Sequence, residues 1–384
     1  MTTRVPVQPR MLEWALLRSG KSSEKVEKKF PKFQGWLKET EQPTLVQLEE
    51  FAKAVYVPFG YLFLSEPPKE ELPIRDFRTV KNREVKQPSP DLLDTIYNCQ
   101  ERQSWYHEFA KAEEYDPVSF IGTATTAMAP EDVAKTIRAT LDLNRATGSQ
   151  YEALRSFILK AEKAHILVMV SGIVQSNSHR KLDVKEFRGF ALADDFAPLI
   201  FINGKDSKSA RMFTLAHELA HLWLGTSGVS NTIAHPFSHS VPEEVWCNKV
   251  AAELLVPLAD LRDCLQHIES IDETVVERLR KNFKVSGLVI LCRLFDAGKL
   301  TRTNFDAAWN KELNLIRQKM AEKKAGSGGS FYNNMGSRMS KPFIRALVGS
   351  TLEGKTLYRD AFRMLGINNA TTLKKMGRDL GMSI

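Results

Sequence analysis

The 384-residue sequence has few cysteines, no long hydrophobic run and no nucleotide-binding loop. Its four cysteines are scattered and form no Cys-x-x-Cys pair, which argues against a disulfide framework and for a reducing compartment. The longest apolar run, residues 166–174, is too short to span a bilayer, and the first residues lack the apolar core of a secretory signal. The sequence also contains no internal repeat. We therefore expect a cytoplasmic protein of two or three domains.

Positive charge is concentrated at both ends of the chain. Residues 331–384 contain nine Lys and Arg against three Asp and Glu, and residues 1–53 contain ten against seven. The net charge is +8, so the part between these ends is close to neutral. If the protein binds nucleic acid, we expect the termini to do so.

A single predicted helix, residues 206–225, carries the clearest chemical motif. Asp206 or Ser207 can cap its start, and Gly225 can end it. Within it, His217-Glu218-Leu-Ala-His221 is an H-E-x-x-H motif. The i, i+4 spacing places both imidazoles on one face, where both can bind one Zn²⁺, and Glu218 lies beside them as a candidate general base. The alternative is that the two histidines are core residues hydrogen-bonded to the backbone. That interpretation gives no reason for a carboxylate, Glu218, between them.

A catalytic zinc site needs a third protein ligand and an open position for water. A second predicted helix, residues 243–257, places Glu244 and Asn248 one turn apart on one side. Glu244 is the preferred ligand, and Asn248 can accept the spare ring N–H of a ligand histidine. Alternative third ligands are Glu243, Glu253, His235 and His239.

The segments HELAHLWLG and EEVWCNKVAAELLVP, with the strand pair FRGFALADDFAPLIFIN before them, resemble the ImmA/IrrE family of zinc peptidases. The E-x-x-x-N layout is also similar to the E-x-x-x-D of thermolysin-like peptidases. The resemblance covers roughly residues 165–295 and implies a regulatory enzyme that cleaves a helix-turn-helix repressor. Cys247 departs from the family, which usually has a small residue there. Its thiolate can approach the metal, and a closed shell completed by Cys247 would make the zinc structural.

The N-terminal residues 1–66 are predicted to form short helices with tight turns. The run from Lys32 to Phe63 resembles Xre-type helix-turn-helix domains, which implies that Lys32, Gln34 and Lys38 face DNA. A helical docking module for a protein is the alternative. Residues 67–90 read as a linker or arm, whose extended core at 72–79 can be a spacer or a strand packed on the next domain.

The expected fold is α+β and mainly α. Strands at 165–174, 186–192 and 198–203 should form a small, partly antiparallel sheet on the H-E-x-x-H helix, as in zincins, with an edge that can hold an extended substrate. His179-Arg180 could stabilise an oxyanion, although a solvated loop is the preferred interpretation. The peptidase domain, with a helical lead-in, should span residues 91–325. A Gly/Ser hinge at 326–330 and a basic helical segment at 331–384 should follow it.

The motifs predict a zinc endopeptidase in which Glu218 takes and returns the proton, and the resemblance to the ImmA/IrrE family implies that it is a regulatory one. Its partner would be a protein, such as a helix-turn-helix repressor or a neighbouring toxin. The alternative is a DNA-binding transcriptional regulator, or the antitoxin of a toxin–antitoxin pair, in which the zinc pocket is secondary.

Overall fold

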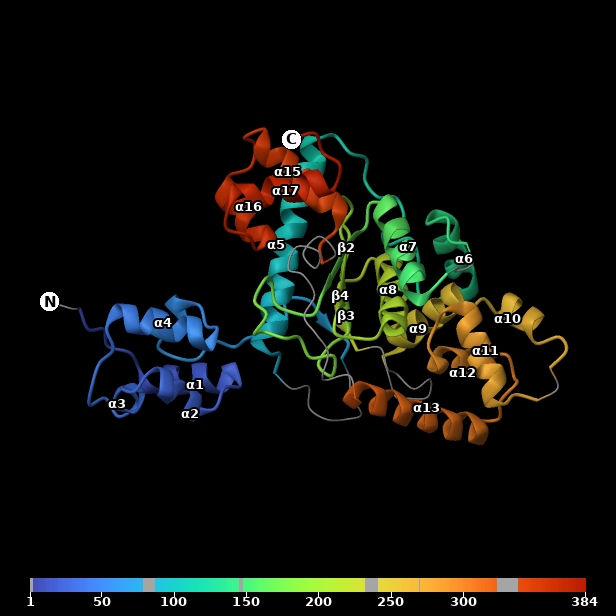
Figure 1. The fold of residues 1–384 in the computed structure, drawn as a ribbon, viewed down its shortest axis with the longest axis horizontal. Helices are drawn as coiled ribbons and strands as arrows, with labels where there is room; N and C mark the ends of the chain where they lie inside the picture. The colour runs from blue at the N-terminus through green and yellow to red at the C-terminus, as the bar shows by residue number, and fades with distance from the viewer. Residues whose placement is uncertain (1–2, 79–86, 145–147, 232–240, 269, 323–337) are drawn as a thin grey trace. The chain divides into compact units, whose positions relative to one another are not determined.

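The computed structural model describes residues 3–78, 87–144, 148–231, 241–268, 270–322 and 338–384. The chain divides into two compact units (Figure 1). The first contains Met1–Pro73 and Lys86–Ile96, and the second contains Ile74–Val85 and Tyr97–Ile384. The predicted hinge at 326–330 lies outside the described residues. No helix in the described part of the chain is both long and apolar enough to cross a membrane.

The first unit is built from short helices around an aromatic core. Its elements are α1 (Pro9–Ser19), α2 (Ser23–Lys29), α3 (Phe33–Leu37), α4 (Leu45–Val55) and the 3-10 helix η1 (Phe59–Phe63). Phe33 stacks on Phe51 with ring centroids 5.2 Å apart, and Trp36 meets Phe51 edge-on. Thr44 starts α4 with a full capping box. The aromatic cluster therefore fixes α3 against α4.

The second unit contains a five-stranded mixed sheet in the order β1-β5-β3-β4-β2. Its strands are β1 (Arg75–Asp76), β2 (Leu167–Ser171), β3 (Gly189–Leu192), β4 (Leu199–Asn203) and β5 (Gly228–Ser230). The pairs β3–β4 and β3–β5 are antiparallel, whereas β2–β4 and β1–β5 are parallel. The small, partly antiparallel sheet in a mainly helical chain is thus confirmed. Of its strands, β5 was not predicted, whereas β1 lies in the extended core at 72–79, for which a strand packed on the next domain was one of the two alternatives.

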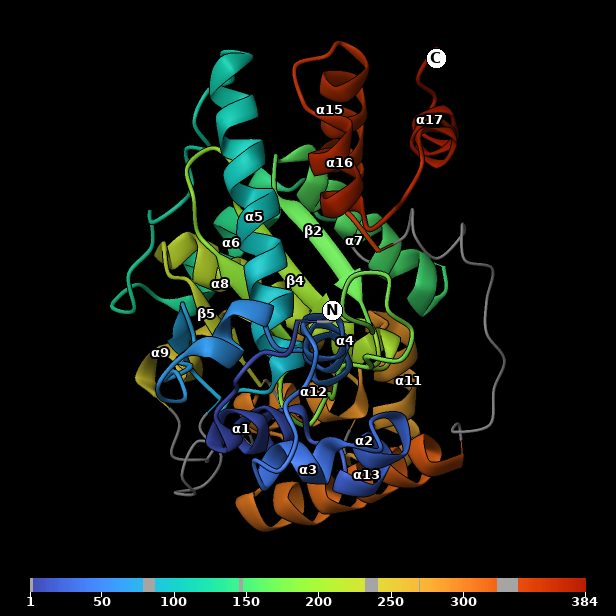
Figure 2. The ribbon, with the colours of Figure 1, turned by 90° about the vertical axis from the view of Figure 1, so that its left-hand side faces the viewer.

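Helices cover both faces of this sheet. The helices that precede or follow the strands are α5 (Pro90–Ala112), α6 (Pro130–Thr140), α7 (Gln150–Lys163), α8 (Lys208–Leu224), α9 (Pro242–Leu255), α10 (Leu258–Cys264), α11 (Glu273–Phe283), α12 (Gly287–Asp296) and α13 (Arg302–Glu322). Figure 2 shows α5 in front of the sheet and α7 and α8 behind it. The Gln103 amide of α5 donates to the carbonyls of Leu192 and Ala197, both at 3.0 Å.

The start of α8 is anchored to the sheet by buried charge. Ser207 caps the helix, and Gly225 ends it in the left-handed conformation at φ 68°. Arg188, next to β3, forms a buried ion pair with Asp206, and the Arg211 side chain donates to the Asp206 carbonyl at 2.8 Å. Gly189 permits the close approach of α8, because a Cβ there would lie 2.5 Å from the Thr214 methyl. These contacts set the position of the motif helix over β3.

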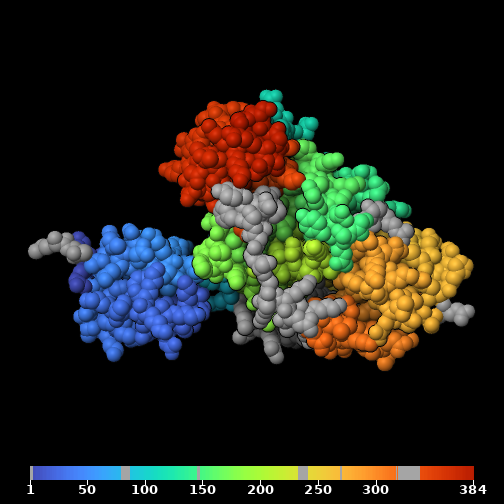
Figure 3. Space-filling model, in the orientation of Figure 1, coloured from blue at the N-terminus to red at the C-terminus, as the bar shows by residue number. Residues whose placement is uncertain are grey.

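The chain ends in three helices that pack on the second unit, namely α15 (Lys341–Leu352), α16 (Tyr358–Leu365) and α17 (Ala370–Asp379). Arg102 of α5 donates to the Met364 carbonyl at 3.0 Å, and the Trp105 ring meets Phe343 edge-on at 5.7 Å. In Figure 3 these helices form one continuous red surface. The basic C-terminal segment is therefore a packed part of the second unit.

Candidate metal centre

Two helices bring three ligand-type side chains to one buried point. His217 and His221 of α8 lie with their Nε2 atoms 3.1 Å apart. Glu244 of α9 places Oε1 at 2.9 Å from the His221 Nε2 and Oε2 at 3.4 Å from the His217 Nε2. The ligand atoms all lie within 4.8 Å of one another. Both imidazoles are fully buried and Glu244 is 5% exposed, so the cluster is shielded from solvent.

The outward nitrogen of each imidazole has its own partner. The His217 Nδ1 lies 3.0 Å from the Asn248 Oδ1, and the His221 Nδ1 lies 3.1 Å from the Thr226 Oγ1. If each Nδ1 carries the proton and donates it there, each Nε2 turns a lone pair toward Glu244. Two imidazole nitrogens and one carboxylate, each ligand histidine with an outer acceptor, are a donor set that fits Zn²⁺.

Electrostatics also favours a cation at this point. Burial alone would raise the pKa of Glu244, but the charges and hydrogen bonds of His217 and His221 outweigh it and lower this pKa to about 2. Burial lowers the pKa of His221, whereas the Glu244 carboxylate raises the pKa of His217 despite burial. The anionic carboxylate is thus retained in the interior only with positive charge beside it, which protons or a metal ion can supply.

Glu218 lies beside the cluster, fully buried on α8. The Ser230 hydroxyl, at the end of β5, donates to its Oε1. Its Oε2 has no hydrogen-bond partner among the described residues. Burial raises the pKa of Glu218 to about 8, against the opposing effects of His217 and Ser230. A buried carboxyl oxygen without a partner is what a proton-accepting group next to a reacting water requires.

The alternative ligands take other positions. Glu243 faces the outer side of His221, with Oε1 at 4.0 Å from Nδ1, and its Oε2 pairs with Arg75 at 3.1 Å. Glu253 pairs with Arg293 and accepts from the Leu258 amide. The other two candidates, His235 and His239, lie outside the described residues.

Cys247 does not approach the cluster as the sequence suggested. Its Sγ lies 3.7 Å from the His221 Nδ1, the nitrogen that points away from Glu244. Burial raises the pKa of this thiol well above its usual range, so the thiolate is disfavoured. The group of described residues able to hold a metal contains only His217, His221 and Glu244. The closed shell completed by Cys247 is therefore inconsistent with this geometry.

The remaining predicted site residues lie elsewhere in the chain. His179 is exposed and Arg180 is buried in the segment between β2 and β3, and their oxyanion role stays a prediction. Lys32 and Lys38 flank the five-residue α3 instead of lying within a longer helix. The Lys32 ammonium lies 2.8 Å from the Glu41 carboxylate, and the Gln34 amide donates to Glu27 at 2.9 Å.

Three residues that contact the site were not predicted. Thr226 follows the helix-ending Gly225, Ser230 lies on a three-residue strand, and Phe77 stacks on His221 with ring centroids 5.1 Å apart. Thr226 and Ser230 follow α8 too closely to form a periodic pattern, so only their hydroxyls beside a motif helix could have suggested them. Phe77 gives no local signal, because the residue that it contacts, His221, lies far from it in the sequence.

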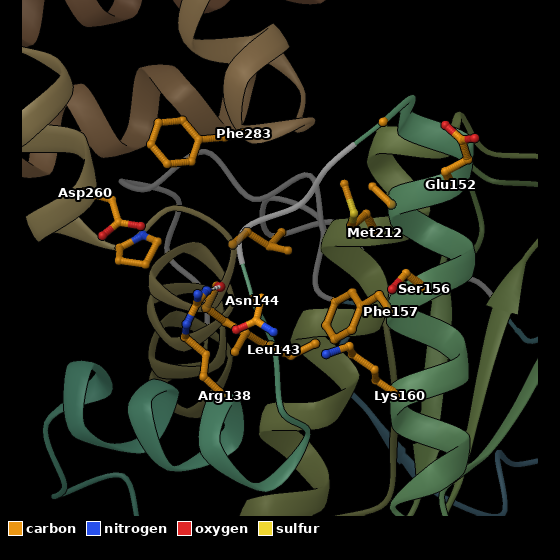
Figure 4. A pocket seen from close by; sticks show the side chains of 15 residues that line it. Arg138, Leu143, Asn144, Glu152, Ser156, Phe157, Lys160, Met212, Asp260 and Phe283 are labelled. Carbon is orange, nitrogen blue, oxygen red and sulfur yellow. Dashed lines mark hydrogen bonds between the residues drawn. The ribbon is translucent and has the colours of Figure 1, made fainter.

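A separate cavity of about 540 Å³ lies between α6, α7, α9 and α11 (Figure 4). Arg138 and Lys160 point toward it from α6 and α7 (Figure 4). The Arg138 guanidinium also donates to the Leu254 carbonyl at 2.8 Å. The described residues that line the cavity do not include His217, Glu218, His221 or Glu244, so the candidate metal centre is a different place.

Comparison with protein families assigns two parts of the chain. Residues 161–295 match the peptidase M78 family, described as an IrrE N-terminal-like domain. Residues 339–379 match a domain of unknown function, DUF8813. No curated protein matches the chain. The predicted resemblance to the ImmA/IrrE peptidases is confirmed for the region that carries α8 and α9, whereas the Xre-type resemblance of the first unit stays a prediction.

Proposed function

We propose that this protein is a regulatory zinc-dependent endopeptidase that cleaves a specific protein partner. The match of residues 161–295 suggests a regulatory metallopeptidase family. The observation that carries the proposal is the buried convergence of His217, His221 and Glu244 beside Glu218, whose Oε2 has no partner among the described residues. These are the parts that metal-assisted hydrolysis of an amide requires.

Each residue of the site has its own role in the proposed reaction. His217, His221 and Glu244 would hold Zn²⁺, which as a Lewis acid polarises the scissile carbonyl and favours deprotonation of water. Glu218 takes the proton of the attacking water at Oε2 and returns it to the leaving amine. Ser230 holds Oε1 and so orients the carboxyl. Asn248 and Thr226 fix the two imidazole tautomers.

The substrate we propose is a protein encoded near this chain's own gene. The family resemblance favours a repressor with a helix-turn-helix domain, and a neighbouring toxin is the other candidate. The test is co-incubation of the full chain, loaded with zinc, with each neighbouring protein, followed by mass spectrometry of fragments. We expect one new fragment with wild-type protein. Glu218→Gln should bind zinc but cleave at least about 10³-fold more slowly, because the proton acceptor is lost.

Glu131→Gln provides a matched control, because Glu131 is an exposed carboxylate in the first turn of α6. It should cleave at the wild-type rate. Cleavage that continues in Glu218→Gln would show that Glu218 is not the general base. Absence of any fragment from every neighbouring protein, under conditions where zinc is bound, would contradict the proposed substrate.

A second candidate is a DNA-binding regulator or antitoxin that acts through the first unit. The exposed lysines at the ends of α3 favour it, whereas the carboxylates of Glu41 and Glu27 beside Lys32 and Gln34 oppose it. A gel shift with DNA upstream of the gene, at low salt, tests it. Binding that Lys38→Glu weakens would support the candidate, and no binding at low salt would contradict it, since phosphate contacts are strongest there.

A further inference from the structure

The outer edge of β5 is covered by the chain itself. β5 pairs with β3 on one side and with β1 on the other. Arg75 lies opposite Gly228 and Asp76 opposite Val229, and the Phe77 amide donates to the Val229 carbonyl at 2.9 Å. These are backbone groups with which an extended peptide would add to the sheet. β1 therefore occupies a place where another chain could bind.

The Phe77 side chain reaches the metal centre. Its ring stacks on the His221 imidazole with planes 17° apart, and Phe77 is 5% exposed. Gly228 leaves the space for this ring, because a Cβ there would lie 2.2 Å from the Phe77 Cε2. An aromatic side chain thus fits into a niche whose walls are a candidate ligand and a glycine of β5.

Charged side chains hold the segment on both sides of Phe77. The Arg75 guanidinium lies 3.1 Å from the Glu243 carboxylate, next to the candidate ligand Glu244. Arg78 is buried, with its guanidinium 2.7 Å from the Asp76 Oδ2 and 3.4 Å from the Glu186 Oε1. β1 is therefore docked by specific contacts, although only two of its residues are in the strand.

The metal centre is closed in this arrangement. His217, Glu218 and His221 are 0% exposed. Ser230 joins β5 directly to Glu218, so the strand that β1 covers is also the strand beside the proposed base. A protein substrate can approach Glu218 along β5 only when β1 has moved away.

The position of β1 in the sequence links it to the first unit. The segment Ile74–Val85 belongs to the second unit, but the residues before and after it, Met1–Pro73 and Lys86–Ile96, belong to the first. β1 is thus tethered at both ends to the helical unit.

We propose that the outer edge of β5 is the binding surface for an extended protein segment, and that Arg75–Phe77 occupies it in the free protein and keeps the metal centre closed. This inference rests on the proposed peptidase function. β1 itself indicates the chemistry that the edge accepts: an aromatic ring over Gly228 and a cation facing Glu243. A substrate segment with both features would compete for the same edge.

The test is binding of a labelled peptide with the sequence of Leu72–Arg78 to the full chain, followed by fluorescence anisotropy. The chain carries Glu218→Gln so that nothing is cleaved. Adding Phe77→Ala should tighten peptide binding at least about tenfold, because the competing occupant is weakened. Arg75→Glu should act in the same direction and does not disturb the core, since the Arg75 side chain is 60% exposed.

Two controls define the outcomes. Phe109→Ala, which removes an aromatic ring stacked on Trp105 of α5, should leave peptide binding at the level of the parent chain. A peptide with Ala in place of Phe77 should bind weakly to every variant. Equal binding of the original peptide by the parent chain and both variants, or binding by neither variant, would overturn the proposal.

Measuring cleavage as well as peptide binding distinguishes a failure of this inference from a failure of the proposed peptidase function. With Glu218 restored, Phe77→Ala should cleave the partner protein at least about tenfold faster than wild type, whereas Phe109→Ala should not. If no variant cleaves anything but the peptide still binds only after β1 is weakened, the peptidase proposal fails and the assignment of the edge survives. If Phe77→Ala cleaves the partner protein at the wild-type rate, β1 does not inhibit the peptidase, and that part of the proposal fails.

Discussion

At the scale of single residues, Asn248 determines which nitrogen of His217 faces Glu244, because its Oδ1 lies 3.0 Å from the Nδ1. We predict that Asn248→Ala lowers zinc affinity about 10- to 100-fold, since the ring loses the acceptor that fixes its tautomer. Asn248→Asp should restore most of it. Competition with a chromophoric chelator measures the affinity, with the exposed Asn304→Ala as control. Unchanged affinity in Asn248→Ala would remove Asn248 from the site.

Glu162 provides a residue-scale prediction about pH. Burial raises its pKa, although its Oε1 accepts a hydrogen bond from the Lys341 amide at 2.9 Å. As pH rises through the ordinary carboxyl range, the unfolded chain ionises first, so this group lowers stability above that range. Glu162→Gln should therefore raise the free energy of unfolding at pH 7 and leave it unchanged near pH 4. Urea titrations at both values test this, and a gain only at pH 4 would contradict it.

At the scale of elements, the end of α8 depends on two glycines in contact. Gly225 has φ 68°, and a Cβ there would lie 2.9 Å from the Gly122 Cα. Gly225→Ala should cost about 2–3 kcal/mol, from the left-handed conformation and the clash together. Gly354→Ala is the matched control, because it has φ 76° and nothing within 4 Å, and it should cost only about 1 kcal/mol. Equal losses in thermal unfolding would show that the contact with Gly122 is unimportant.

The elements that the sequence predicted well are those with local signals. The periodic apolar face of α8, with Ser207 and Gly225 at its ends, is complete within one stretch of chain. The i, i+4 spacing on α9 was likewise enough to predict that Glu244 and Asn248 lie on the same side of the helix, where they contact His221 and His217. β1 and β5 have two and three residues, too few for an alternating pattern, and each is defined only by its distant partner. Part of the site therefore lies in contacts that no local window contains.

At the scale of the whole molecule, metal should stabilise the second unit selectively. Zinc at a thousandfold excess over its dissociation constant should add about 4 kcal/mol to the free energy of unfolding, provided that the unfolded chain does not bind it. Hydrogen exchange with mass spectrometry should show added protection in peptides from α8 and α9 and none in α1 or α4. Chelator should reverse the effect, and His221→Ala should abolish it. Equal protection in both units would contradict a site confined to the second.

The division of the chain also limits how the protein can be taken apart. The boundaries after Pro73, Val85 and Ile96 mean that the polypeptide crosses between the two units three times, the last time within α5. A protease that cuts the segment around β1 would leave two fragments, each of which contains residues of both units. Truncation before Ile74 would remove most of the first unit but keep its segment Lys86–Ile96. The buried side chains of Leu92 and Leu93 would then lose the unit to which they belong. Gene fusion or fission at this border is therefore constrained by topology, and a shortened peptidase would need α5 redesigned along its first turns.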